Sequence, residues 1–93
     1  MAATYTFELN SNGRIINASK NMCKFFGINE SGFGFHYIQS FTKNPLQSFI
    51  ELQGTGEFRL RNPRRRSYLV KITRLESEGY SYHIEGFRTH GRC

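Results

Sequence analysis

Alternation of apolar and polar residues in the second half of the chain limits the fold more than any other feature. A strand with one buried and one solvated face shows this period, because successive side chains point to opposite faces. The apolar positions are Phe58 and Leu60, then Tyr68, Val70 and Ile72, then Tyr80, Tyr82 and Ile84. Turn sequences at 62–66 and 76–79 separate the three stretches, which therefore predict three consecutive strands.

The beginning of the chain predicts a hairpin. Apolar residues occupy every second position of residues 5–9, and residues 14–17 form a second short apolar stretch. The sequence 10–13 between them contains Asn, Ser and Gly, and Gly13 can adopt the positive φ that a tight turn needs. We therefore expect two strands joined by this turn.

A short helix is predicted after the hairpin. Ser19 is a suitable N-cap residue. Met22, Phe25 and Phe26 then have the i, i+3, i+4 spacing of one helix face, and Gly27 is typical of a helix end.

A second, central helix is predicted over about residues 45–53. Asn44 would cap it and Pro45 suits its first turn. Leu46, Phe49 and Ile50 would form its apolar face. Between the two helices we expect short turns that place rings in the core, from Phe33, Phe35, Tyr37, Ile38 and Phe41.

The order of these elements favours an α+β fold. Two strands, short helices and three strands predict a five-stranded antiparallel sheet with the helices packed on one face. The 93 residues are enough for one domain. We assign residues 1–93 to it, with a core over about 5–88.

Residues 12–28 resemble the opening hairpin and first helix of the PAS family, with a glycine turn, an apolar strand, a capped helix and a closing glycine. The three-strand end, with Asn62 and Pro63 in its polar turn, is similar to that family as well. The family commonly has Asn where Ser19 stands. The resemblance implies a sensory or regulatory module that binds a protein partner, a second copy or a small ligand. Such a module controls an attached or partner effector such as a kinase.

No sequence feature supports catalysis or a metal site. Nucleophile and base residues in a recognisable order and phosphate-binding glycine loops are absent from the sequence. His36, His83 and His90 are isolated, and Cys23 has no partner at ligand spacing. We expect no enzyme activity.

Cofactors of the family are not expected either. Haem-binding relatives place a His on the central helix, and residues 45–53 contain none. Flavin-binding relatives carry a Cys on a later helix, whereas Cys23 lies on the first and reads as a small buried residue. A small apolar ligand remains an alternative to a filled core. The candidate lining residues are Leu46, Phe49, Ile50, Phe58, Leu60, Val70, Ile72, Tyr82 and Ile84.

Positive charge is concentrated in the second half of the chain. The sequence has 13 Lys and Arg against 7 Asp and Glu, a net charge of +6. This excess predicts an acidic partner. The candidate partner-binding residues are Arg59, Arg61, Arg64, Arg65, Arg66, Leu69, Lys71 and Phe87, with Leu69 and Phe87 as apolar groups on the polar face of the sheet. A protein partner, an adjoining domain or a homodimer is expected, and a small basic nucleic-acid-binding protein is the alternative.

The expected location is the cytoplasm, or the nucleus. Two cysteines, one of them the last residue, do not suggest a disulfide scaffold. No apolar run approaches the roughly 18 residues that cross a membrane.

Overall fold

A computed structural model describes the backbone of residues 4–89 and the side chains of residues 4–85. The strands are β1 (Thr6–Leu9), β2 (Ile15–Ala18), β3 (Thr55–Arg61), β4 (Ser67–Arg74) and β5 (Tyr80–Thr89). The α-helices are α1 (Lys20–Phe26) and α2 (Leu46–Ile50), and the short 3-10 helices are η1 (Glu30–Gly32) and η2 (Ile38–Ser40). Among the described residues, no helix is both long and apolar enough to cross a membrane.

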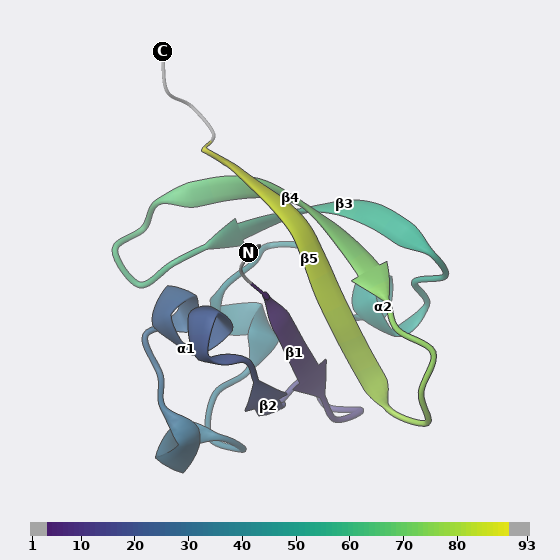
Figure 1. The fold of residues 1–93 in the computed structure, drawn as a ribbon, viewed down its shortest axis with the longest axis horizontal. Helices are drawn as coiled ribbons and strands as arrows, with labels where there is room; N and C mark the ends of the chain where they lie inside the picture. The colour runs from purple at the N-terminus through teal and green to yellow at the C-terminus, as the bar shows by residue number, and fades with distance from the viewer. Residues whose placement is uncertain (1–3, 90–93) are drawn as a thin grey trace.

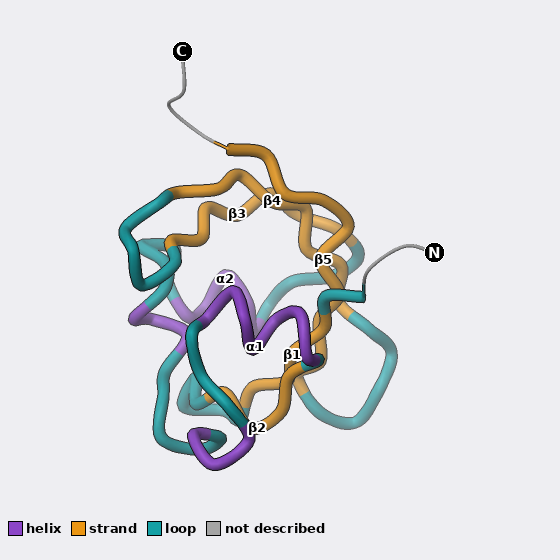
Figure 2. Tube along the Cα trace, turned by 60° about the vertical axis from the view of Figure 1, so that its left-hand side comes forward, coloured by secondary structure: helices purple, strands orange, loops and turns teal. Residues whose placement is uncertain are grey.

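The strands form one antiparallel sheet in the order β2-β1-β5-β4-β3. β1 and β5 are neighbours, so the two ends of the domain meet in the middle of the sheet (Figure 1). The sheet curves around α1 and α2, which lie on the same side of it (Figure 2). The predicted fold class is confirmed: a PAS-like α+β fold with helices on one face.

Aromatic rings fill the space between the sheet and the helices. Phe26 lies 4.5 Å from Phe41 between ring centroids, and Phe7 stacks on Tyr82 at 5.2 Å. Large rings bury much apolar surface per residue, which lets a short chain form a core. The buried apolar residues are Phe7, Leu9, Ile15, Met22, Phe26, Ile38, Phe41, Phe49, Phe58, Leu60, Val70, Ile72, Tyr82 and Ile84.

The limits of α1 follow the local sequence. The Ser19 hydroxyl accepts the N–H of Met22 at 3.4 Å and that of Thr6 at 3.1 Å, so it caps the helix and ties it to β1. Gly27 ends the helix with φ 74°, a left-handed conformation that glycine adopts readily. Both positions are as predicted.

The central helix differs from the prediction. α2 contains five residues instead of the nine expected over 45–53, and no side chain caps it. The Asn44 side-chain oxygen instead accepts the N–H of Arg59 at 3.0 Å, because the edge of β3 needs an acceptor there. At the other end, carbonyl groups of α2 are held by side chains of the sheet, which takes the place of further helical turns.

The prediction that the aromatic and aliphatic side chains of residues 33–41 lie in the core is partly wrong. Ile38 and Phe41 are buried, but Phe35 is 78% exposed and Tyr37 is 37% exposed. The segment turns at residues 33–35 beside β2: Gly34 N–H donates to the carbonyl oxygen of Ile15 at 2.8 Å, and Arg14 and Tyr37 form a bridge. Residues 35–37 are all exposed there, and the chain enters the core only with Ile38 and Phe41.

Candidate functional site

The predicted ligand-lining residues come together between α2 and the sheet. Seven of them are buried in the core: Phe49, Phe58, Leu60, Val70, Ile72, Tyr82 and Ile84. Leu46 packs against the core, and Ile50 is half-buried. The ring of Phe49 lies 4.4 Å from that of Phe58. These rings are in contact, and a ligand in this place stays a prediction.

Tyr82 connects the sheet to α2. Its hydroxyl donates a hydrogen bond of 2.6 Å to the carbonyl oxygen of Phe49, inside the core. Burial raises the pKa of Tyr82 to about 12, because the phenolate would lose its hydration; nearby Arg74 lowers the pKa and Tyr80 raises it further, each to a smaller extent.

Arg74 holds the same end of α2, and the sequence analysis missed it. Its guanidinium donates to the carbonyl oxygens of Ile50 at 3.3 Å and Gly79 at 3.2 Å, and lies 4.9 Å from the centroid of the Tyr80 ring. Its Nε atom is buried without a hydrogen-bond partner. The sequence did contain an indication: Arg74 follows Val70 and Ile72 at every second position of β4, so its side chain is expected on the inward face.

The predicted basic residues lie on the face of the sheet that the helices leave open. Arg59, Arg61 and Lys71 are exposed, and Arg59 pairs with Leu69 in the register of β3 and β4. The turn after β3 carries three more exposed arginines, Arg64, Arg65 and Arg66. We call the open face of the sheet the outer face, and the turn with Arg64, Arg65 and Arg66 the arginine turn. No ion pair joins any of the described residues on it, although Glu57 lies opposite Lys71 in the strand register.

Leu69 and Phe87 are the two apolar residues of the predicted partner surface. Leu69 is half-buried on the outer face, as expected. Phe87 pairs with Val70, because the register shifts between Lys71 and Ile72, and Leu69 pairs with Arg88 instead. The side chain of Phe87 lies outside the described residues, and its assignment to the partner surface stays a prediction.

The far end of the outer face is polar and internally satisfied. The hydroxyls of Thr55 and Thr73 are 2.8 Å apart, and Thr73 donates to the Glu85 carboxylate at 2.7 Å. Glu57 lies directly opposite Lys71 in the register of β3 and β4. The unbalanced positive charge is thus concentrated around Arg59, Arg61 and the arginine turn.

A small basic pocket opens at the β3 edge of the outer face. Its volume is about 190 Å³, and it is lined by Thr42, Lys43, Arg59, Arg61 and Ser67. None of these side chains is acidic. The residue pattern of β3 predicted the two arginines but not Lys43, because only the tertiary structure brings residues 42–43 to the strand.

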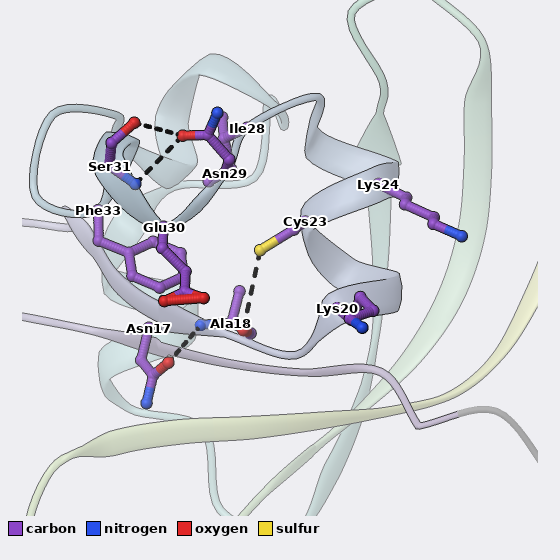
Figure 3. Close-up of a pocket in the computed structure, with 10 residues that line it drawn as sticks. All are labelled: Asn17, Ala18, Lys20, Cys23, Lys24, Ile28, Asn29, Glu30, Ser31 and Phe33. Atoms are coloured by element: carbon purple, nitrogen blue, oxygen red, sulfur yellow. Dashed lines mark hydrogen bonds between the residues drawn. The ribbon is translucent and has the colours of Figure 1, made fainter.

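A larger open cleft lies between β2, α1 and η1 (Figure 3). Its volume is about 830 Å³, and Ala18, Cys23, Ile28 and Phe33 form its apolar part. The Cys23 thiol points toward Ala18, whose carbonyl oxygen is 3.8 Å from the sulfur (Figure 3). Cys23 is half-buried and not a core residue. Burial raises the pKa of the Cys23 thiol, with a further contribution from Glu30, so the thiol is kept neutral.

Metal ligands do not gather in the described part of the chain. No group of three His, Cys, Asp or Glu side chains comes close enough there to hold an ion. His36 and His83 are described, whereas His90 lies outside the described residues.

Comparison with known proteins supports the fold. No protein-family model and no curated protein matches the chain. Among solved structures, it is similar to the PAS domain of an HTR-like protein from Haloarcula marismortui, with a TM-score of 0.62 and 16% sequence identity. The match covers 92% of this chain and 82% of that one. At this identity the likeness shows a PAS-like fold, without a function.

Proposed function

We propose that this chain is a sensory or regulatory module of the PAS type that docks an acidic protein partner on its outer face. The partner is a separate protein or an adjoining effector domain, such as a kinase. The observation that carries the proposal is the position of Arg59, Arg61 and the arginine turn on a face that no described element covers.

Charge and shape both support docking at this place. The arginines around the turn after β3 repel one another, and an acidic partner relieves that repulsion. Leu69 lies among them, paired with Arg59 and next to Lys71. An apolar centre with a charged rim is the usual anatomy of a protein interface. A second copy of the chain would bring the same positive charge to this end, which disfavours a homodimer through it.

The module would pass its signal through the sheet. Leu69 faces outward on β4, while its neighbours Tyr68 and Val70 face the helices. On the same side, Arg74 and Tyr82 hold the last turn of α2. A partner that shifts β4 would therefore act on α2. A small apolar ligand between α2 and the sheet is an alternative input, although the close ring contacts favour a filled core.

The proposal includes neither catalysis nor a haem or flavin cofactor. The central helix has no histidine, and Cys23 lies on α1 with its thiol kept neutral. We place the module in the cytoplasm, since its two cysteines do not suggest the disulfide scaffold that is typical of proteins in an oxidising compartment.

Nucleic acid is the weaker alternative partner. Proteins that bind single strands stack bases on aromatic side chains. Between residues 55 and 85, the outward-facing positions of the strands carry hydroxyl, acidic, basic and histidine side chains and Leu69, but no Phe or Tyr. Glu57 and Glu85 also place negative charge on this face.

Fluorescence anisotropy with two labelled ligands tests the proposal. One is an acidic peptide with a central leucine, and the other is a single-stranded oligonucleotide, both at low and at moderate salt. We expect the peptide to bind, and Leu69→Asp to weaken it by about tenfold. Leu75→Asp is the control, because Leu75 is 37% exposed and follows the end of β4 that lies away from Arg64, Arg65 and Arg66.

Two results would contradict docking of an acidic protein. Tighter binding of the oligonucleotide, lost in the Arg64→Glu, Arg65→Glu, Arg66→Glu variant, would favour nucleic acid. Equal loss in the Leu69 and Leu75 variants would show that the outer face is not the docking surface. Native mass spectrometry of the purified protein would reveal a co-purified ligand as extra mass that is lost on denaturation.

A further inference from the structure

The exposed edge of β3 is covered by the segment 41–44. Arg61 N–H donates to the carbonyl oxygen of Phe41 at 2.7 Å, and the Thr42 hydroxyl donates to that of Arg59 at 2.6 Å. Asn44 accepts the N–H of Arg59 at 3.0 Å. One bond between backbone groups and two bonds from side chains fix the segment, so Lys43 is held beside β3.

This arrangement brings three cations to one small pocket. Arg59 and Arg61 are two residues apart on the same strand face, so their Cα atoms are about 7 Å apart, within reach of a shared ligand. Lys43 lines the same pocket from the other side. No described acidic side chain forms an ion pair with any of the three. Glu57 lies on the same strand face as Arg59 but does not line the pocket, whose charged lining groups are all positive.

The hydroxyl groups of the pocket have different states. The Thr42 hydroxyl is used within the protein, because it donates to Arg59 and accepts the N–H of Asn44 at 3.0 Å. The Ser67 hydroxyl makes no hydrogen bond with another described group. Ser67 pairs with Arg61 across the strands, and both residues line the pocket.

We propose that this pocket binds a phosphoryl group. A phosphate monoester carries a charge near −2 and offers three acceptor oxygens, which match three cations and a free hydroxyl better than one carboxylate does. The volume of about 190 Å³ accommodates such a group but not a larger cofactor. The phosphoryl group comes from free phosphate or from a phosphorylated side chain of the partner, and the second source rests on the proposed docking function.

Titration with inorganic phosphate, followed by ¹H–¹⁵N NMR on the full chain, tests the pocket itself. Sodium chloride at equal ionic strength is the reference. We expect phosphate, but not chloride, to shift the amide signals of Lys43, Arg59, Arg61 and Ser67 in a saturable manner. Shifts that chloride reproduces, or shifts spread evenly over all arginines, would overturn the proposal.

Paired variants separate the pocket from general attraction. The first variant carries Arg59→Gln and Arg61→Gln, and the second carries Arg64→Gln and Arg66→Gln. Both lose the same charge, and all four side chains are exposed, so both variants should fold. Circular dichroism checks this. Phosphate affinity should fall by about tenfold or more in the first variant and by less than about threefold in the second. Equal losses would refute a specific pocket.

A peptide arm distinguishes the two sources. The acidic peptide is compared with a copy that carries one phosphoserine. Tighter binding of the phosphorylated copy, abolished by the Arg59 and Arg61 changes, assigns the site to a phosphorylated partner. Phosphate binding without any peptide preference assigns it to the free ion and refutes the partner source. If neither peptide binds while inorganic phosphate still does, the docking function is refuted and the phosphate pocket is not.

Discussion

Replacing Tyr82 with Phe tests the connection between the sheet and α2. The substitution removes a buried hydroxyl and its 2.6 Å hydrogen bond to Phe49 while keeping the ring in the core. The Phe49 carbonyl oxygen keeps a second, longer bond from the N–H of Leu52 at 3.3 Å. At neutral pH we therefore expect the free energy of unfolding to fall by about 1 kcal/mol.

The pH dependence of this loss is the sharper expectation. The pKa of Tyr82 is 10.0 without perturbation and about 12 in the folded protein. The folded state thus holds the proton more tightly, and the stability that this contributes is complete below about pH 10 and is lost as the pH rises toward 12. The loss is roughly 1 kcal/mol per pH unit. The variant lacks this term, so the two proteins should be equally stable near about pH 11.

Urea unfolding followed by circular dichroism, at several pH values from neutral to strongly alkaline, measures the difference directly. The other tyrosines and lysines titrate in both proteins, so their contributions cancel in the comparison. Curves that run parallel throughout this range would refute the reasoning, because they would mean that Tyr82 ionises as easily in the folded as in the unfolded chain.

Two further substitutions test the cap and the core. Ser19→Ala should cost about 1–2 kcal/mol, since the hydroxyl serves the N–H groups of both Met22 and Thr6; a loss below a few tenths in urea unfolding would argue against the cap. Phe49→Ala should cost about 3–5 kcal/mol, or leave the chain unfolded, whereas Phe35→Ala should change the melting temperature little because its ring is 78% exposed. Similar losses for both would show that the segment 33–37 beside β2 is misplaced.

Local sequence predicted the features that depend on near neighbours. The cap at Ser19 and the end at Gly27 need only the following turn of chain, and both are found as expected. The length of α2 was not predictable in this way. Asn44 is a good cap by residue type, but the edge of β3 competes for its side chain, and that edge is distant in sequence.

The candidate site shows the same division. Alternation along β3 and β4 placed Arg59, Arg61 and Lys71 on the solvated face, where the structure has them. It could not place Lys43 next to those arginines, since that depends on hydrogen bonds between residues 41–44 and β3, which are distant in sequence. The alternation of apolar and polar residues also does not predict the register shift between β4 and β5, which pairs Phe87 with Val70.

The sequence by itself determined the number and kind of strands, the face of each that is apolar, and the excess of positive charge in the second half. These follow from side-chain direction and composition, which are local properties. Tertiary structure alone decided which distant groups meet. Arg74 and Tyr82 reach the carbonyl groups of α2, and Lys43 joins two arginines around a pocket, because buried and edge backbone groups must find partners wherever the fold provides them.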